Sequence, residues 1–281
     1  KLIIMSMSGE GVTGPRRDYS GVATTFVALS GIAHLSGFPG KPPFELIYWP
    51  DIEFADWGVM SLLSALLERD RTGKGMFIDL AANEALSWYT GDTFMDVAMN
   101  QRNAERDDPW PPAIVQGCFR SAGEERFISI AVGTDEEWQA LCRELGRPDL
   151  ASDERFATGT GRRANQAAME QCINESTSQL ENVALAERLQ AAGVAAIPTF
   201  NGEELYSLPH LWAREAFTTV VHPLTGQSVT LSGPAWKFSE TPAAVRGAGP
   251  VLCEHNDYVF GEILGLPREE IERLTDAGAL K

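Results

Sequence analysis

One acidic residue, Asp51, stands where an extended run is expected to turn into a long helix. Residues 44–49 have the composition of a strand, and apolar residues from Ile52 onward recur with helical spacing. A carboxylate at a helix N-terminus is held in its ionised form by the helix dipole. It therefore needs no general base and can attack an activated carbonyl directly. Open sheet-and-helix proteins place reactive groups at such junctions, so Asp51 is a candidate nucleophile.

Two other interpretations of this segment remain open. Asp is a preferred N-cap residue, so Asp51 could simply cap the helix that follows. Glu53 and Asp56 lie close by and are competing carboxylates, and the spacing does not decide between them and Asp51.

A glycine pattern near the N-terminus matches a second kind of chemistry. Gly9, Gly11 and Gly14 follow an expected strand with the G-x-G-x-x-G spacing of dinucleotide-binding proteins. However, residues 15–18 do not continue as an apolar-periodic helix, and no second strand ends in an acidic residue at the required distance. The pattern is interpreted as a glycine-rich surface turn. A nucleotide-dependent oxidoreductase is a weak alternative, and no nicotinamide cofactor is expected.

The composition restricts the function classes. The chain has 281 residues, of which 44% are hydrophobic, enough for one large domain or two. The net charge of −16 argues against a nucleic-acid or anionic-membrane partner. The four cysteines lack CxxC spacing and the four histidines lack an HExxH motif, so no metal site is expected and the thiols should be buried and reduced. We see no signal peptide and no apolar run that could span a bilayer, and the chain is expected to be cytoplasmic.

Hydrophobic periodicity and turn residues predict the following order of elements. Strands are expected at 2–7, 77–80, 127–132, 218–221 and 228–231, the last two as a hairpin. Helices are expected at 21–35, 52–72, 84–100, 138–145, 183–192, 257–264 and 267–276. Apolar residues cover most of the surface of the helix at 52–72, so this helix is expected to be deeply buried. The residues Thr134 to Glu137 form a capping-box signature, and Ser178 to Glu181 repeat it. The charged, proline-rich stretch 102–112 is a candidate crossing between domains.

Several blocks of the sequence, in the same order, resemble the class III coenzyme A transferases, the CaiB/BaiF-type family of formyl-CoA transferase and carnitine CoA-transferase. The matching blocks are residues 4–15, 28–31, 50–51, 65–75, 130–138, 189–194, 222–223 and 254–255. Residues 65–75, with the sequence ALLERDRTGKG, are the most specific of them.

The resemblance implies a fold, a reaction and a set of site residues. It implies an α/β fold, in which a Rossmann-like large domain, incomplete at its N-terminus, carries a smaller α+β second domain. The large domain would comprise residues 1–105 and 230–281, and the small domain and linker residues 106–229. It matches Asp51 to the family's covalent nucleophile, which moves coenzyme A from an acyl-CoA to a carboxylic acid through aspartyl anhydride and aspartyl-CoA thioester intermediates. Arg16, Ala82, Gln116 and Gly117 are the expected coenzyme A contacts, and two interlocked subunits are the expected assembly.

Two departures from the family pattern leave alternatives open. The chain begins at Lys1 inside an expected strand, so we expect a preceding segment or a separate chain to supply the rest of the large domain. Val22 stands where the related acyl-CoA racemases need a histidine for proton transfer, so a racemase is disfavoured. The alternative from a different class is a non-catalytic subunit that completes a paired chain.

Overall fold

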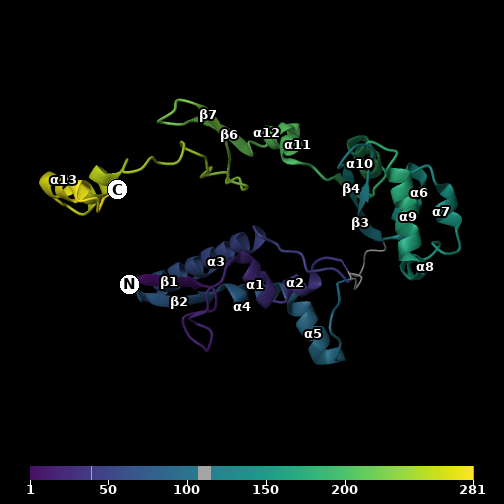
Figure 1. The fold of residues 1–281 in the computed structure, drawn as a ribbon, viewed down its shortest axis with the longest axis horizontal. Coiled ribbons are helices and arrows are strands. Elements are labelled where there is room, and N and C mark those ends of the chain that lie inside the picture. The colour runs from purple at the N-terminus through teal and green to yellow at the C-terminus, as the bar shows by residue number, and fades with distance from the viewer. Residues whose placement is uncertain (39, 107–114, 281) are drawn as a thin grey trace. The chain divides into compact units, whose positions relative to one another are not determined.

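The computed structural model describes residues 1–38, 40–106 and 115–280 (Figure 1). The chain divides into two compact units, Lys1–Ala113 and Ile114–Lys281, here called unit 1 and unit 2. Both contain helices and short strands, so the fold is mixed α/β. The Rossmann-like character of the large domain and the domain boundaries at 105 and 229 remain predictions. Most of the expected linker at 102–112 lies outside the described residues.

Unit 1 is built on a two-stranded parallel sheet. Strand β1 (Ile3–Ser8) pairs with β2 (Met76–Ala81), and the long helix α3 (Trp49–Thr72) packs against both strands. Both strands were predicted. The remaining elements of unit 1 are α1 (Ala23–Leu29), α2 (Ile32–Leu35), α4 (Ala82–Ser87), the 3₁₀ helix η1 (Trp88–Thr90) and α5 (Gly91–Asn100).

Helix α3 ends as predicted but is not deeply buried. Its last turn carries Arg69 and Arg71, and Gly73 follows with a φ of 73°, the left-handed conformation that suits glycine at a helix end. The prediction of deep burial is wrong, since only Pro50, Gly58 and Ala65 are buried. A two-stranded sheet covers one side of a helix only. The exposed apolar face of α3 is formed by Ile52, Val59, Met60, Leu63 and Leu67.

Three local expectations in unit 1 are also wrong. Residues 44–47 are irregular and form no strand, and α3 begins at Trp49 instead of Ile52. The single helix expected at 21–35 is two helices, because Gly31 adopts a φ of 87° between α1 and α2.

The helix expected at 84–100 is likewise interrupted, by η1. The Thr90 hydroxyl donates to the carbonyl oxygens of Ser87 and Ser30, at 2.9 and 3.2 Å, and Thr90 precedes α5. A hydroxyl that competes for backbone acceptors in this way favours a break between helices.

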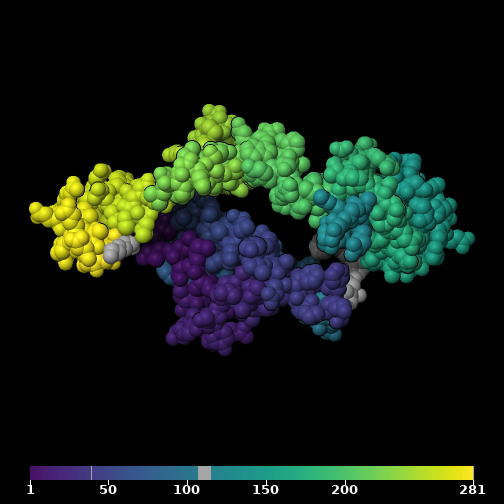
Figure 2. All heavy atoms as spheres, turned by 45° about the horizontal axis from the view of Figure 1, so that its top comes forward, coloured from purple at the N-terminus to yellow at the C-terminus, as the bar shows by residue number. Residues whose placement is uncertain are grey.

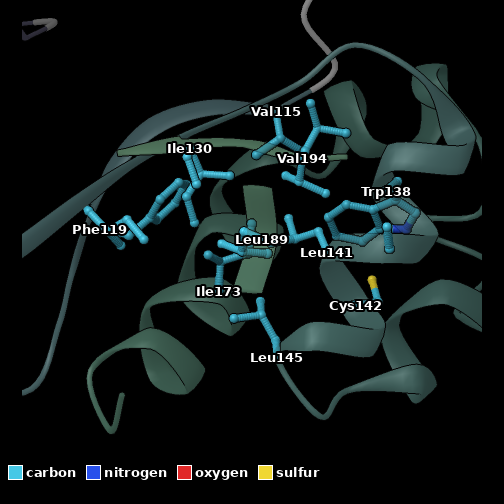
Figure 3. Packing of buried hydrophobic residues seen from close by; sticks show 14 of the residues in the cluster. Val115, Phe119, Ile130, Trp138, Leu141, Cys142, Leu145, Ile173, Leu189 and Val194 are labelled. Carbon is cyan, nitrogen blue, oxygen red and sulfur yellow. The ribbon is translucent and has the colours of Figure 1, made fainter. Parts of the chain in front are cut away.

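The main core of unit 2 lies between a small sheet and several helices. Strands β3 (Val115–Arg120), β4 (Phe127–Val132) and β5 (Ala195–Pro198) form an antiparallel sheet in that order, and α9 (Gln166–Thr177) and α10 (Asn182–Ala191) contact it. Buried side chains from the strands and helices converge between them, among them Ile130, Leu141, Leu189 and Val194 (Figure 3). In Figure 2 the teal part of the chain, which encloses this core, forms one continuous body.

The rest of unit 2 contains short elements. They are α6 (Asp135–Glu144), α7 (Pro148–Ser152), α8 (Gly159–Ala164), α11 (Gly202–Ser207), α12 (Pro209–Ala213), β6 (Phe217–Val221), β7 (Ser228–Ser232), the π-helical η2 (Asp257–Ile263) and α13 (Arg268–Asp276). The predicted strand 127–132 and the hairpin of β6 and β7 are confirmed.

The two capping signatures have different outcomes. The Thr134 hydroxyl accepts from the Glu137 N–H at 3.1 Å, and the Glu137 carboxylate accepts from the Thr134 N–H at 3.2 Å, so the predicted capping box of α6 is confirmed. For the second signature, the predicted cap residue, Ser178, is wrong. Glu181, not Ser178, caps α10, because its carboxylate accepts from the N–H groups of Val183 and Ala184.

The cysteines are unpaired, but only some are buried. Cys142 is buried and Cys172 is half-buried, whereas Cys118 and Cys253 are exposed. The expectation of buried thiols is therefore wrong for two of the four.

Candidate active site

Asp51 lies in the first turn of α3, with its side chain exposed. The N-cap position belongs to Tyr48, and Asp51 is the third residue of the helix, after Trp49 and Pro50. The interpretation of Asp51 as the N-cap is therefore wrong. Proline early in the helix extends it back beyond the aspartate, because the fixed φ of proline suits the first turn. A carboxylate in this turn still interacts favourably with the helix dipole.

The three neighbouring carboxylates differ in their partners. Glu53 accepts a hydrogen bond from the Tyr89 hydroxyl. Within the described residues, the Asp51 and Asp56 side chains have no hydrogen-bond or ion-pair partner, and both residues are exposed. Asp51 is thus the carboxylate that combines a first-turn position with an unoccupied side chain.

The start of α3 is anchored by packing on its other side. Trp49 packs against the small core of unit 1, which consists of Val27, Ile32 and Leu86. The Trp49 ring also meets the Tyr89 ring edge-on, with centroids 5.1 Å apart. The backbone that carries Asp51 is therefore held by buried neighbours while its side chain faces solvent.

Arg16 lines a cavity of about 250 Å³ in unit 1. The glycine-rich turn at residues 9–14 forms one wall, and Asp79 of β2 forms another. The Asp79 carboxylate accepts from the Val12 N–H at 3.1 and 3.2 Å, which fixes the turn against β2. No helix follows this turn until α1, so the prediction that residues 15–18 do not continue as a helix is confirmed. Arg16 is the cation in the lining of this cavity, which also includes the carboxylates of Glu10, Asp79 and Glu84.

Ala82 is 1% exposed and opens α4 directly after β2. Its side chain is enclosed by protein, so only its backbone could contact a ligand.

Gln116 and Gly117 lie on β3 in unit 2. They line a cavity of about 490 Å³ on the sheet, together with residues of β4 and β5 and Gln190 of α10. The Gln190 amide is held in place, since it donates to the Ala196 carbonyl at 2.9 Å. The two residues are thus brought together at one cavity, which belongs to a different unit from Asp51, Arg16 and Ala82.

Sequence reasoning missed two residues that shape these sites. Asp79 is an acidic residue inside the apolar strand segment MFIDLA, and such a charge was a usable signal. Tyr89 lies inside the helix expected at 84–100 and has no spacing signal of its own, because its contact with Glu53 joins segments that are distant in sequence.

Two features are absent from the described part of the chain, a metal-binding cluster and a membrane-spanning helix. This part holds no group of three or more His, Cys, Asp or Glu side chains that could bind a metal ion. Nor does it contain a helix with the length and hydropathy needed to cross a bilayer.

Comparison with known proteins gives consistent matches along the chain. The chain is 28% identical to a succinyl-CoA–D-citramalate CoA-transferase of Chloroflexus aurantiacus, over 97% of this chain and 68% of that protein. It is 29% identical to the beta subunit of a succinyl-CoA–L-malate CoA-transferase of the same organism, over 98% of this chain and 68% of that protein. The crystal structure of a CAIB/BAIF family protein from Brucella suis superposes with a TM-score of 0.82 at 28% identity, covering 93% of this chain and 68% of that one.

The chain therefore spans about two thirds of the length of these relatives, as the coverage of 68% indicates. The family model of CoA-transferase family III matches residues 1–256. The resemblance seen in the sequence is confirmed over most of the chain, which belongs to CoA-transferase family III, a family of enzymes that transfer coenzyme A.

Proposed function

We propose that this protein moves coenzyme A from an acyl-CoA donor to a carboxylic acid acceptor, with Asp51 as the covalent nucleophile. The observation that carries the proposal is the position of Asp51, an exposed carboxylate in the first turn of α3 without a partner among the described residues. A carboxylate is itself a nucleophile toward an activated carbonyl, so the attack needs no general base.

The proposed reaction has four steps that restore Asp51. Its carboxylate attacks the thioester carbonyl of the donor, which forms a mixed anhydride and releases the coenzyme A thiolate. The thiolate attacks the Asp51 carbonyl of the anhydride, which gives an aspartyl-CoA thioester and frees the donor acid. The acceptor carboxylate then attacks this thioester and forms a second anhydride, again releasing the thiolate. Attack of the thiolate on the acceptor carbonyl yields the new acyl-CoA and regenerates the Asp51 carboxylate.

The anhydrides and the thioester must be protected from water, and their oxyanions need hydrogen-bond donors. Arg16 is the cation that we propose for a phosphate group of coenzyme A, because it lines a cavity beside a turn rich in backbone N–H groups. The backbone at Ala82, and Gln116 and Gly117 at the cavity of unit 2, are the other proposed contacts.

The test traps the covalent intermediate. The protein is incubated with succinyl-CoA, the donor named in both relatives, and with D-citramalate or L-malate. Hydroxylamine attacks the Asp51 anhydride or thioester, so peptide mass spectrometry should find a hydroxamate on Asp51. Asp51→Asn should abolish both this label and the transferase activity. Asp56→Asn is the matched control and should keep both. Activity of D51N at the rate of the parent protein would refute the proposed role.

A second candidate function is that of a subunit that completes a paired transferase. It is favoured by the exposed apolar face of α3, since large exposed apolar patches mark interaction surfaces. One relative is itself named as the beta subunit of a transferase. A second copy of this chain or a different subunit would serve as partner. An Asp51 peptide that stays unmodified with every donor tested would favour a non-catalytic subunit.

A further inference from the structure

A stripe of large side chains follows one face of α3 from its first turn. Trp49, Glu53 and Trp57 are spaced four residues apart, and the helix has about 3.6 residues per turn, so they lie one above another. All three meet the short helix η1 (Trp88–Thr90), which follows α4.

Tyr89 of η1 contacts two of the three residues directly. Its hydroxyl donates to the Glu53 carboxylate, and its ring meets the Trp49 ring at an angle of 72°, with centroids 5.1 Å apart. The neighbouring Trp88 meets Trp57 in the same edge-on manner, with centroids 5.9 Å apart. Tyr89 therefore joins the first and second turns of α3 to a separate element.

The first turn of α3 needs such an anchor because it has no side-chain cap. Tyr48 occupies the N-cap position and makes no side-chain hydrogen bond to the free N–H groups of the turn. Uncapped helix ends fray more readily, because the first N–H groups of the helix lack hydrogen-bond acceptors. Trp49 and Glu53 lie two residues before and two residues after Asp51, so they fix the backbone on both sides of it.

We infer that Tyr89 is a positioning residue that holds the first turn of α3, and with it Asp51, through Trp49 and Glu53. This inference rests on the proposed function of Asp51. Two residues along a helix correspond to a rotation of about 200°, so Tyr89 acts on the face opposite Asp51 and leaves that carboxylate open to substrate. The hydrogen bond to Glu53 also raises the pKa of Tyr89 above its usual value, so the phenol remains a donor at neutral pH.

Tyr89→Phe tests the inference, because it keeps the ring contact with Trp49 and removes only the hydroxyl. Hydrogen exchange is measured by mass spectrometry on the full chain, in the peptide that covers residues 48–57. Hydrogen bonds to charged groups are the stronger ones, so we expect this peptide to exchange about tenfold faster in Y89F. In a transferase assay with the same donor and acceptors, without hydroxylamine, kcat should fall by a similar factor, with an unchanged KM for the acyl-CoA.

Two further variants separate positioning from a general loss of structure. Tyr48→Phe removes a phenol that is 82% exposed at the same end of α3, and it should leave exchange and kcat as in the parent. Glu53→Gln retains a neutral carbonyl oxygen that can accept from Tyr89, so its exchange and kcat should lie between those of the parent and Y89F, whereas Glu53→Ala should behave as Y89F.

Exchange does not depend on catalysis, so the two proposals fail separately. Parental exchange of residues 48–57 in Y89F would overturn the positioning role, whatever the activity. Faster exchange in Y89F, together with full activity of D51N, would support the role of Tyr89 in holding the helix turn and would refute the role of Asp51 as nucleophile. An equal fall in kcat in Y48F and Y89F would also overturn the inference.

Discussion

The first two turns of α3 contain three carboxylates whose chemistry is set by their neighbours. Glu53 is engaged by the Tyr89 hydroxyl, and Asp51 and Asp56 have no such partner among the described residues. Asp51 alone of these two lies in the first turn, where the dipole is strongest. A difference of a few residues along one helix therefore distinguishes Asp51, the proposed nucleophile, from Glu53 and Asp56.

The buried thiol of Cys142 in unit 2 predicts how the stability of the protein depends on pH. It is 1% exposed in the main core, and this burial raises the pKa of its thiol from 9.0 to about 12. Between these two values the unfolded chain loses the thiol proton while the folded protein keeps it. Stability should therefore fall as the pH rises above about 9, by up to about 1.4 kcal/mol per pH unit from this group.

The measurement is urea denaturation at pH 7.5 and pH 10. Cys142→Ala should lose about 1 kcal/mol less stability than the parent between these two conditions, because it has no thiol to titrate. Cys118→Ala removes an exposed thiol and should follow the parent. If C142A and the parent lose equal stability, the thiol of Cys142 is not shielded in solution.

At the level of single residues, the sequence predicted the position of Asp51 only in part. It placed a carboxylate at the beginning of a long helix, and that is confirmed. It could not place the first residue of the helix, because the residues before Pro50 look extended by composition and are fixed by packing of Trp49 instead. Tyr89 was missed for a related reason, since its partner lies 36 residues away.

At the scale of elements, the approach of the α3–β2 connection to β1 depends on Gly75. A Cβ atom built on Gly75 would lie 1.9 Å from the Leu2 carbonyl oxygen, which accepts the Met76 N–H at 3.1 Å. The backbone at Gly75 and the backbone at Leu2 cannot move apart without loss of the hydrogen bond that begins the pairing of β1 with β2. Gly75→Ala should therefore destabilise unit 1 by about 3 kcal/mol.

Gly91→Ala is the matched control for this prediction. Gly91 has a φ of −60° at the start of α5, and nothing lies within 4 Å of a Cβ atom placed on it. Alanine should be neutral there or should stabilise by about 0.5 to 1 kcal/mol. Chemical denaturation followed by tryptophan fluorescence measures both variants. Equal stability of G75A and G91A would show that the pairing of β1 with β2 tolerates a wider gap.

Elements with local signals were predicted well, and elements decided by distant contacts were not. The capping box of α6 and the hairpin of β6 and β7 are encoded in a few adjacent residues. The break between helices at Thr90 depends on the Ser30 carbonyl oxygen, 60 residues away, so no local sequence pattern predicts it.

At the scale of the whole molecule, the two units differ in how much apolar surface they bury. In the described part of the chain, the main core of unit 2 contains nineteen buried residues and that of unit 1 contains three. The apolar residues of α3 predicted a deeply buried helix, and this is wrong for the structure, because composition does not say whether any surface covers the helix. The exposed Leu67 (74%) and Ile52 (61%) show that the other described elements of unit 1 do not provide this surface.

This difference predicts how the full chain exchanges its amide hydrogens. Local stability follows buried apolar contacts, so at low protein concentration β1, β2 and α3 should exchange at least about tenfold faster than β3, β4 and α10. If a second chain covers the apolar face of α3, mass action should slow exchange in α3 as the protein concentration rises. Leu67→Glu places a charge on that face and should remove the concentration dependence, whereas Val183→Glu, on an exposed site of α10, should not. Slow exchange of α3 at every concentration, in the parent and in L67E alike, would mean that unit 1 needs no partner to be stable, and the paired-subunit function would lose its support.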